Sequence, residues 1–289
     1  MDWKLARHGS FAGVKGPVLA CVLDGVGIGR HDESDAVWLA RTPHLDFLHQ
    51  QALATTLRAH GTAVGMPSDA DMGNSEVGHN ALGCGRVFDQ GAKLVAAAIA
   101  DGRIFQDAAW QRLTDRVRES GEPMHFIGLL SDGNVHSHID HLFAMIRRCD
   151  EEEIPKVRVH VLLDGRDVPK TSGLGYVDAL EELLETYRSR GRDYRVASGG
   201  GRMRITMDRY EADWSMVERG WKTHVHGEGP HFRSAREAIE TAYKNDPKLD
   251  DQNLPAFVVA DDAGPVGPIR DGASVVFFNF RGDRAMELA

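Results

Sequence analysis

The segment Met124-His-Phe-Ile-Gly-Leu-Leu-Ser-Asp-Gly-Asn-Val-His136 joins an apolar run to a polar, glycine-bearing loop. The run 124–130 predicts a buried β-strand, and the apolar spacing of 139–149 after the loop predicts a helix. A second apolar run, 157–163, predicts another strand. The order strand, helix, strand is typical of a parallel sheet with right-handed crossovers.

The same alternation continues toward the C-terminus. The sequence there predicts a loop at 164–169, a helix at 173–190, a strand at 194–197, a glycine-rich loop at 198–204, helices at 213–219 and 234–243, and strands at 257–259 and 274–280. Upstream, caps and apolar periodicity predict helices at 43–51, 90–100 and 108–120, and a short strand at 55–59. The fold class is therefore α/β, with a mostly parallel sheet.

Each loop that follows a strand in this part of the chain carries histidine, arginine or aspartate. The carboxyl ends of parallel strands meet at one edge of a sheet, so we expect these side chains to converge. They are His136, Arg166, Asp167, Arg202, Arg209, Arg281 and Arg284. Guanidiniums around one pocket suit a substrate with phosphate and carboxylate groups, while the histidine and aspartate could bind hydroxyls or move protons. The alternative is that the arginines are solvated surface residues.

The spacing of His136, His138 and His141 could also suggest a metal site. A helix that begins at Ile139 would carry only His141, so the three imidazoles need not share a face. We therefore do not predict a metal at these histidines.

Upstream lies the stretch Asp69-Ala-Asp-Met-Gly-Asn-Ser-Glu-Val-Gly-His-Asn80. Asn74 or Ser75 can cap a helix that runs through 76–82 and stops at Gly83 and Gly85. This places Ser75 at a helix N-terminus, where free N–H groups and the helix dipole favour a phosphate. Ser75 is a candidate nucleophile if a base or metal activates it. The alternative is that Ser75 serves only as a cap.

The run Pro17-Val-Leu-Ala-Cys-Val-Leu-Asp24-Gly-Val-Gly27 is apolar and ends in a carboxylate and glycines. It predicts a buried parallel strand over 18–23 with Asp24 at its carboxyl end, where α/β sheets bind their ligands. Asp24 and Ser75 together would make half of a metal-activated serine site.

Composition narrows the class of protein. The 289 residues are 42% hydrophobic and carry a net charge of −9, which disfavours nonspecific nucleic-acid binding. The three cysteines, Cys21, Cys84 and Cys149, have no motif spacing, which favours a reduced, intracellular protein without a thiolate zinc site. The sequence contains no membrane-length apolar run and no secretory signal pattern.

Taken together, the motifs resemble the cofactor-independent (2,3-bisphosphoglycerate-independent) phosphoglycerate mutase family of the alkaline phosphatase superfamily. The resemblance rests on Leu23-Asp-Gly-Val-Gly, Met72-Gly-Asn-Ser-Glu-Val-Gly-His-Asn, Leu130-Ser-Asp-Gly-Asn-Val-His-Ser-His, Leu163-Asp-Gly-Arg-Asp, Gly200-Gly-Arg-Met-Arg-Ile-Thr-Met-Asp-Arg-Tyr-Glu and Asn279-Phe-Arg-Gly-Asp-Arg. The form of the fifth motif is closest to the plant and trypanosomatid branch.

The resemblance implies an enzyme that interconverts 3- and 2-phosphoglycerate in glycolysis and gluconeogenesis, without 2,3-bisphosphoglycerate. It implies a phosphatase-like metal and serine domain, to which we assign residues 1–87, and an inserted phosphoglycerate-binding domain, 88–289. Two divalent ions are implied, manganese above all, with magnesium or cobalt as alternatives. Ser75 would become phosphoserine, and Asp24 and Ser75 would ligate metal. The family's substrate positions match His136, Arg166, Asp167, Arg202, Arg209, Arg281 and Arg284. A cytoplasmic monomer, with no nucleic-acid or membrane partner, is expected.

The chain departs from the family by ending at Ala289, one turn after a helix expected near Arg284. The family's other metal ligands and active-site lysine follow that point, so we expect an inactive N-terminal part of a longer enzyme. Gly282 replaces an alanine or proline of relatives, and Arg204 has no assigned role. Two alternatives stay open: another metal-dependent phosphatase or phosphomutase of the superfamily, such as a phosphopentomutase, and a non-catalytic fragment that only binds phosphoglycerate.

Overall fold

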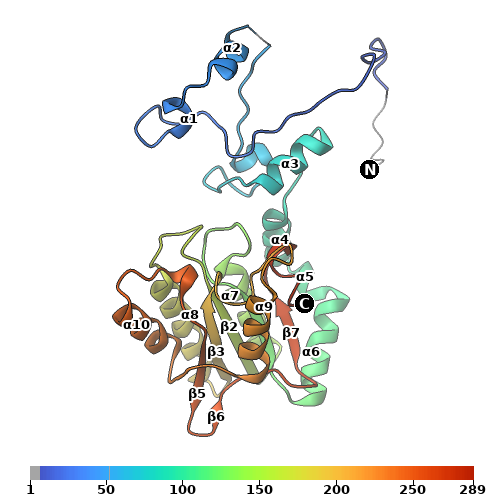
Figure 1. The fold of residues 1–289 in the computed structure, drawn as a ribbon. Coiled ribbons are helices and arrows are strands. Elements are labelled where there is room, and N and C mark those ends of the chain that lie inside the picture. The colour runs from blue at the N-terminus through green and yellow to red at the C-terminus, as the bar shows by residue number, and fades with distance from the viewer. Residues whose placement is uncertain (1–6, 52) are drawn as a thin grey trace. The chain divides into compact units, whose positions relative to one another are not determined.

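The computed structural model describes residues 7–51 and 53–289 (Figure 1). The chain divides into two compact units, residues 1–57 and 58–289. Within the first unit, the described residues form helices α1 (Ala36–Leu39) and α2 (Pro43–Gln51), and none of them is buried. Asp35 caps α1 by accepting a hydrogen bond from the backbone N–H of Trp38 at 3.0 Å.

Two predicted strands are wrong. Residues 18–23 and 55–59 form no regular secondary structure, and their side chains are exposed. A strand is stable only when a neighbour satisfies its backbone N–H and C=O groups, and no other described segment pairs with either run. An apolar run therefore predicts the tendency to form a strand but not the partner that the strand needs.

The second unit begins with small helices and one long one. They are η1 (Gly61–Val64), α3 (Ser75–Cys84), α4 (Gly91–Ala100), α5 (Arg103–Gln106) and α6 (Ala108–Ser120). The side chain of Asn74 caps α3, and Gly85 ends it in the left-handed conformation at φ 65°. Of the two predicted cap residues, the structure selects Asn74, and Ser75 becomes the first helical residue.

The sheet forms the centre of this unit. Its strands are β1 (Met124–Leu129), β2 (Lys156–Leu163), β3 (Asp193–Gly201), β4 (His231–Phe232), β5 (Phe257–Asp261), β6 (Gly264–Pro265) and β7 (Ser274–Phe277). Their order is β4-β5-β3-β2-β1-β7, with β6 beside β5. Strands β7, β1, β2 and β3 are mutually parallel, and β5 runs antiparallel to β3. The predicted mostly parallel α/β sheet is confirmed.

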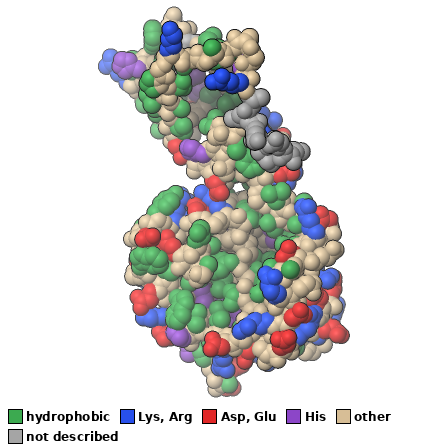
Figure 2. All heavy atoms as spheres, turned by 90° about the vertical axis from the view of Figure 1, so that its right-hand side faces the viewer, with side chains coloured by type: hydrophobic (Ala, Val, Ile, Leu, Met, Phe, Trp, Pro, Cys, Tyr) green, Lys and Arg blue, Asp and Glu red, His purple; other side chains and the backbone are tan. Residues whose placement is uncertain are grey.

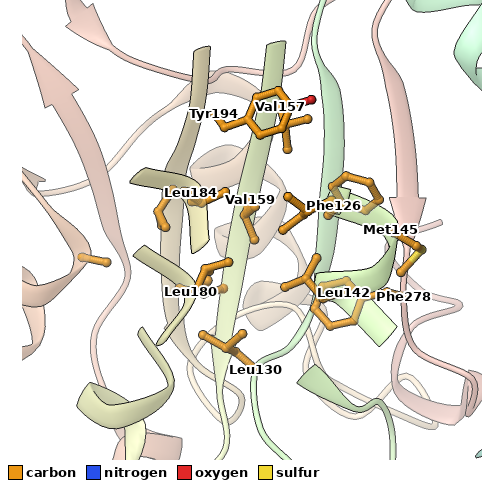
Figure 3. Packing of buried hydrophobic residues seen from close by; sticks show 14 of the residues in the cluster. Phe126, Leu130, Leu142, Met145, Val157, Val159, Leu180, Leu184, Tyr194 and Phe278 are labelled. Atoms are coloured by element: carbon orange, nitrogen blue, oxygen red, sulfur yellow. The ribbon is translucent and has the colours of Figure 1, made fainter. Parts of the chain in front are cut away.

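Helices cover one face of the sheet. Besides α6, they are α7 (Ile139–Glu151), α8 (Gly173–Arg188) and α10 (Ala235–Asn245). Figure 3 shows side chains of α7 and α8, such as Leu142 and Leu180, meeting strand residues such as Phe126 and Val159 in this core. Every second strand residue points into it, which is the period expected of a pleated strand.

The other face is covered by α9 (Trp214–Trp221), the π-helical turn η2 (Lys222–His226) and the segment 202–209. Two short 3-10 turns complete the unit, η3 (Asp251–Asn253) and η4 (Gly282–Arg284). The helix expected near Arg284 is thus only a 3-10 turn. On the face of this unit that Figure 2 shows, acidic and basic side chains are interspersed rather than gathered by sign.

The predicted glycine loop at 198–204 is partly wrong, because β3 continues through Gly201. Glycine is required there for close packing. A Cβ on Gly199 would lie 2.5 Å from the Phe257 ring, and one on Gly201 would lie 2.4 Å from the Gln252 carbonyl oxygen. Glycines indicate close approach inside a strand as well as freedom in a loop.

Candidate functional site

Arg202 follows β3 directly and is the best connected of the predicted site residues. Its side chain is 1% exposed, so its charge must be met inside the protein. Its Nη1 donates to Asp164 Oδ1 at 2.8 Å and to Asp167 Oδ2 at 2.6 Å, and its Nη2 donates to His136 Nε2 at 2.8 Å. One guanidinium thus joins the loops that follow β1, β2 and β3.

Asp164 is the first residue after β2 and organises the loop around it. Its Oδ2 accepts from Ser131 Oγ at 2.6 Å, and its Oδ1 accepts the backbone N–H groups of Arg166 and Asp167 at 3.2 and 3.0 Å. These bonds hold Asp167 toward Arg202. The Arg166 side chain is exposed.

His136 lies on the loop after β1 and is neutral at physiological pH. Burial first, and then the charges of Arg202 and Arg281, lower the pKa of His136 to about 2. A guanidinium can only donate, so Nε2 accepts from Arg202 and the proton resides on Nδ1. Nδ1 faces Asp283 Oδ1 at 3.6 Å, a distance too long for a hydrogen bond.

Asp283 brings two more arginines to the same place. Its Oδ2 lies 3.4 Å from Arg209 Nη1 and 3.0 Å from Arg281 Nη2. Arg281 also forms an ion pair with Glu76 of α3 at 2.7 Å. These carboxylates partly neutralise the charges of Arg209 and Arg281.

Arg284 is buried beside these groups. Its Nη1 donates to the Met207 carbonyl oxygen at 2.7 Å. Burial, followed by the charges of Arg202 and Arg209, lowers the pKa of Arg284 to about 10, so the side chain stays protonated at neutral pH. The charge of Arg166 acts on Arg284 in the same direction. The loops that end β1, β2, β3 and β7 therefore do converge.

Several buried polar atoms of this cluster have no partner. They are His136 Nδ1, Arg202 Nε, Asn279 Nδ2 and Asp283 Oδ1. An unpartnered buried polar atom is costly, and such atoms gather where a ligand or water is to be bound. Donors dominate the set, and an oxygen-rich anion would satisfy them.

Ser75 is exposed in the first turn of α3. Asn74 Oδ1 accepts the Val77 N–H at 3.2 Å, which leaves the Ser75 hydroxyl outside the cap. Two contacts within the second unit tie this segment to the strand-end loops: the ion pair of Glu76 with Arg281, and a hydrogen bond from Asn134 to Asp71.

Asp24 lies in an exposed turn of the first unit, so its expected pairing with Ser75 at a metal stays a prediction. Among residues 7–51 and 53–289, no group of three or more His, Cys, Asp or Glu side chains is placed to hold a metal ion. Two oxygen ligands are fewer than divalent ions take in proteins. Asp24 and Ser75 are therefore not a complete metal site, and we derive no step through a metal.

Three acidic residues of the cluster were missed in the sequence: Glu76, Asp164 and Asp283. Asp164 had a usable signal, because it follows an apolar run of sequence in the same way as Asp24 does. Glu76 lies in a helix and Asp283 lies beside arginines, and no local sequence pattern marks either as a site residue. Arg204, which had no assignment, lies on the surface and donates from Nε to the Asn253 carbonyl oxygen at 3.2 Å.

Comparison with known proteins identifies the family. Residues 95–289 match the family model "BPG-independent PGAM N-terminus". The chain belongs to this family. It is 55% identical over 288 residues to a probable 2,3-bisphosphoglycerate-independent phosphoglycerate mutase of Leptospira interrogans, covering 99% of this chain and 52% of that protein.

Two further relatives agree with this identification. The 2,3-bisphosphoglycerate-independent phosphoglycerate mutase of Trypanosoma brucei brucei is 52% identical over 291 residues, covering 100% of this chain and 52% of that protein. A Leishmania mexicana phosphoglycerate mutase structure, solved at low cobalt concentration, superposes with a TM-score of 0.89 at 50% identity, covering 92% of this chain and 49% of that one. The chain thus spans about half the length of the family members it matches, and the predicted kinship with the plant and trypanosomatid members is confirmed.

Proposed function

We propose that the strand-end cluster of the second unit binds phosphoglycerate, and that the protein interconverts 3- and 2-phosphoglycerate without 2,3-bisphosphoglycerate. The observation that carries the proposal is the convergence of Arg202, Arg209, Arg281 and Arg284 in one cluster of strand-end side chains, several of whose buried donors lack partners. A phosphate dianion and a carboxylate would accept from these guanidiniums. The neutral His136 and the carboxylate of Asp167 would contact the glycerate hydroxyls, and Arg166 would close over the ligand from the surface.

In the proposed reaction, the phosphoryl group passes from the substrate oxygen to Ser75 Oγ, the serine proton ends on the departing oxygen, and the glycerate stays bound at the arginine cluster. The glycerate reorients, and its other hydroxyl takes the phosphoryl group back. The position of Ser75 at the start of α3, tied to Arg281 through the neighbouring Glu76, supports this role. Two divalent ions, of which manganese is our first choice and magnesium or cobalt the alternatives, would lower the pKa of the serine when bound. Asp24 and Ser75 would be two of their ligands.

The proposal divides the chain by chemistry: residues 1–87 belong to the metal and serine part, and 88–289 to the phosphoglycerate-binding part. We place the protein in the cytoplasm as a monomer. Of the described residues, none forms a helix long and apolar enough to cross a membrane.

Calorimetric titration of the 289-residue chain with 3-phosphoglycerate tests the binding step. We expect saturable binding that falls when Arg284→Gln removes one guanidinium, because a lost charged hydrogen bond weakens affinity by roughly tenfold or more. Arg204→Gln is the matched control, since Arg204 lies on the surface two residues from Arg202 and its side chain donates to the Asn253 carbonyl oxygen. If the two substitutions changed the affinity for 3-phosphoglycerate equally, the assignment of the binding site would be refuted.

A second candidate function is binding without turnover, which fits the finding that residues 7–51 and 53–289 hold no group of three or more side chains placed to bind a metal ion. A coupled assay that converts 3- to 2-phosphoglycerate, with manganese and then with a chelator, separates the two. Chelator-sensitive turnover by the chain would refute binding alone, and binding without turnover would support it.

A further inference from the structure

A buried row of polar side chains crosses the sheet face opposite the helical core. His125 Nδ1 lies 2.9 Å from His160 Nε2, and His160 Nδ1 lies 2.7 Å from Ser198 Oγ. Ser198 Oγ lies 2.8 Å from His224 Nδ1, and His224 Nε2 lies 3.0 Å from Thr206 Oγ1. All five side chains are at most 1% exposed. The proposed reaction uses none of them.

The strands are shaped to build this row. The register between β2 and β3 shifts after Val159, so that Val159 pairs with Val196 but His160 pairs with Ser198. The extra residue on β3 is a β-bulge, which re-aims a side chain and is frequent beside functional sites. Here the bulge sets Ser198 opposite His160, and the next hydrogen bond leads to His224 in the π-helical turn η2. Such turns are also frequent at functional sites.

Thr206, at the end of the row, is a strained residue. Its φ is 71°, a left-handed value that a β-branched residue adopts only when its surroundings impose it. Three contacts impose it here. The Thr206 N–H donates to the Met216 carbonyl oxygen at 3.2 Å, and the Thr206 hydroxyl contacts His224. Gly220 packs against Thr206 so closely that a Cβ on Gly220 would lie 2.2 Å from Thr206 Oγ1.

This strained residue stands between two arginines of the pocket. Arg202 precedes it by four residues, Arg209 follows it by three, and the next residue, Met207, presents its carbonyl oxygen to Arg284 Nη1 at 2.7 Å. The backbone angles of Thr206 set the direction in which the chain enters Met207, and so help to place that carbonyl.

We propose that the buried Thr206–His224 pair is a positioning element that fixes the 202–209 segment so that Arg284 and Arg209 are held ready for phosphoglycerate. The inference rests on the proposed function of the pocket. The hydrogen-bonded row from His125 to Ser198 holds the His224 ring in place. The left-handed conformation of Thr206 is the one in which the Met207 carbonyl oxygen meets Arg284.

Thr206→Val tests the pair, because it keeps the shape and the β-branch but removes the hydroxyl. By calorimetric titration of the 289-residue chain with 3-phosphoglycerate, we expect Kd to rise about tenfold, which is the size of one charged hydrogen bond. Thr206→Ser restores the hydroxyl and should bring Kd back to within about threefold of wild type. The side-chain N–H groups of Arg284, followed by NMR, should exchange faster in Thr206→Val.

Thr114→Val is the matched control. Thr114 is fully buried on α6 and its Oγ1 donates to the Gln111 carbonyl oxygen at 3.0 Å, away from the pocket. The Thr114→Val substitution should lower the melting temperature, as Thr206→Val does, but leave the Kd for 3-phosphoglycerate unchanged. His224→Phe removes the other partner of the pair. If Thr206→Val does not fold, the Kd of His224→Phe tests the proposal instead. Combined with Thr206→Val, it should add little to the rise in Kd, because both remove the same contact.

The outcomes separate the two proposals. If the wild-type chain binds 3-phosphoglycerate and the folded Thr206→Val and His224→Phe variants bind it equally well, the positioning role alone is overturned. A wild-type chain that does not bind millimolar 3-phosphoglycerate overturns the proposed pocket and this inference with it.

Discussion

Replacing Arg202 with methionine should destabilise the second unit more than any other single arginine substitution near the pocket. The change keeps much of the buried stem but removes the charge that meets Asp164 and Asp167. Breaking a buried ion pair from one side costs about 3–5 kcal/mol, because a carboxylate is left uncompensated. Asp164 keeps three other donors and Asp167 is 14% exposed, so we expect the lower end, about 3 kcal/mol.

Urea unfolding followed by far-ultraviolet circular dichroism measures this loss. With a slope of about 3 kcal/mol per molar urea, the midpoint should fall by about 1 M. Arg204→Met is the matched control, since its side chain is exposed and should cost no more than about 0.5 kcal/mol. A midpoint for Arg202→Met that differs from that of Arg204→Met by less than about 0.2 M would show that the buried network does not stabilise the fold.

Three further predictions follow from the described contacts. Burial lowers the pKa of His125 to about 4 and of His224 to about 3, so the unfolded chain binds protons that the folded chain does not. Stability should therefore hold above pH 6.5 and fall below it, by about 2 kcal/mol per histidine at pH 5, and equal urea midpoints at pH 7 and pH 5 would contradict this. Asn74→Ala should cost about 1 kcal/mol and speed amide exchange at Val77, whose N–H loses its acceptor; unchanged exchange would show that the cap is not needed. Gly220→Ala should cost about 2 kcal/mol and weaken 3-phosphoglycerate binding, because its Cβ would meet Thr206, whereas Gly175→Ala in α8 meets nothing and should stabilise by up to about 1 kcal/mol. A Gly220→Ala variant as stable as the Gly175→Ala one would contradict the close approach.

Local patterns predicted most of the second unit. The expected helix at 108–120 is α6 to the residue, and the expected strand at 157–163 is β2 with one residue added. These elements pack in a core made from residues of the same region, so periodicity was sufficient. The first unit buries none of its described residues, so the equally apolar run at 18–23 had nothing to pair with.

The candidate site, like the fold, could be predicted only in part. Position at a strand end was enough to predict that His136, Arg202, Arg209 and Arg284 would converge, because parallel topology brings those ends together. It could not predict which charges pair. Nor could it predict the bulge that turns Ser198 toward His160, since the bulge is visible only in the register of two strands.

Asp283 shows most clearly what only the fold reveals. In the sequence it is one acidic residue near two arginines, and such a residue is usually an ordinary surface partner of either arginine. In the fold its two oxygens have different surroundings: Oδ2 meets Arg209 and Arg281, while Oδ1 faces the Nδ1 proton of His136 without reaching it. Because Arg202 donates to Nε2, the proton of His136 resides on Nδ1, which faces Oδ1 across that gap. Three loops and three different strands must be in place before that gap exists, so no local sequence pattern could have revealed it.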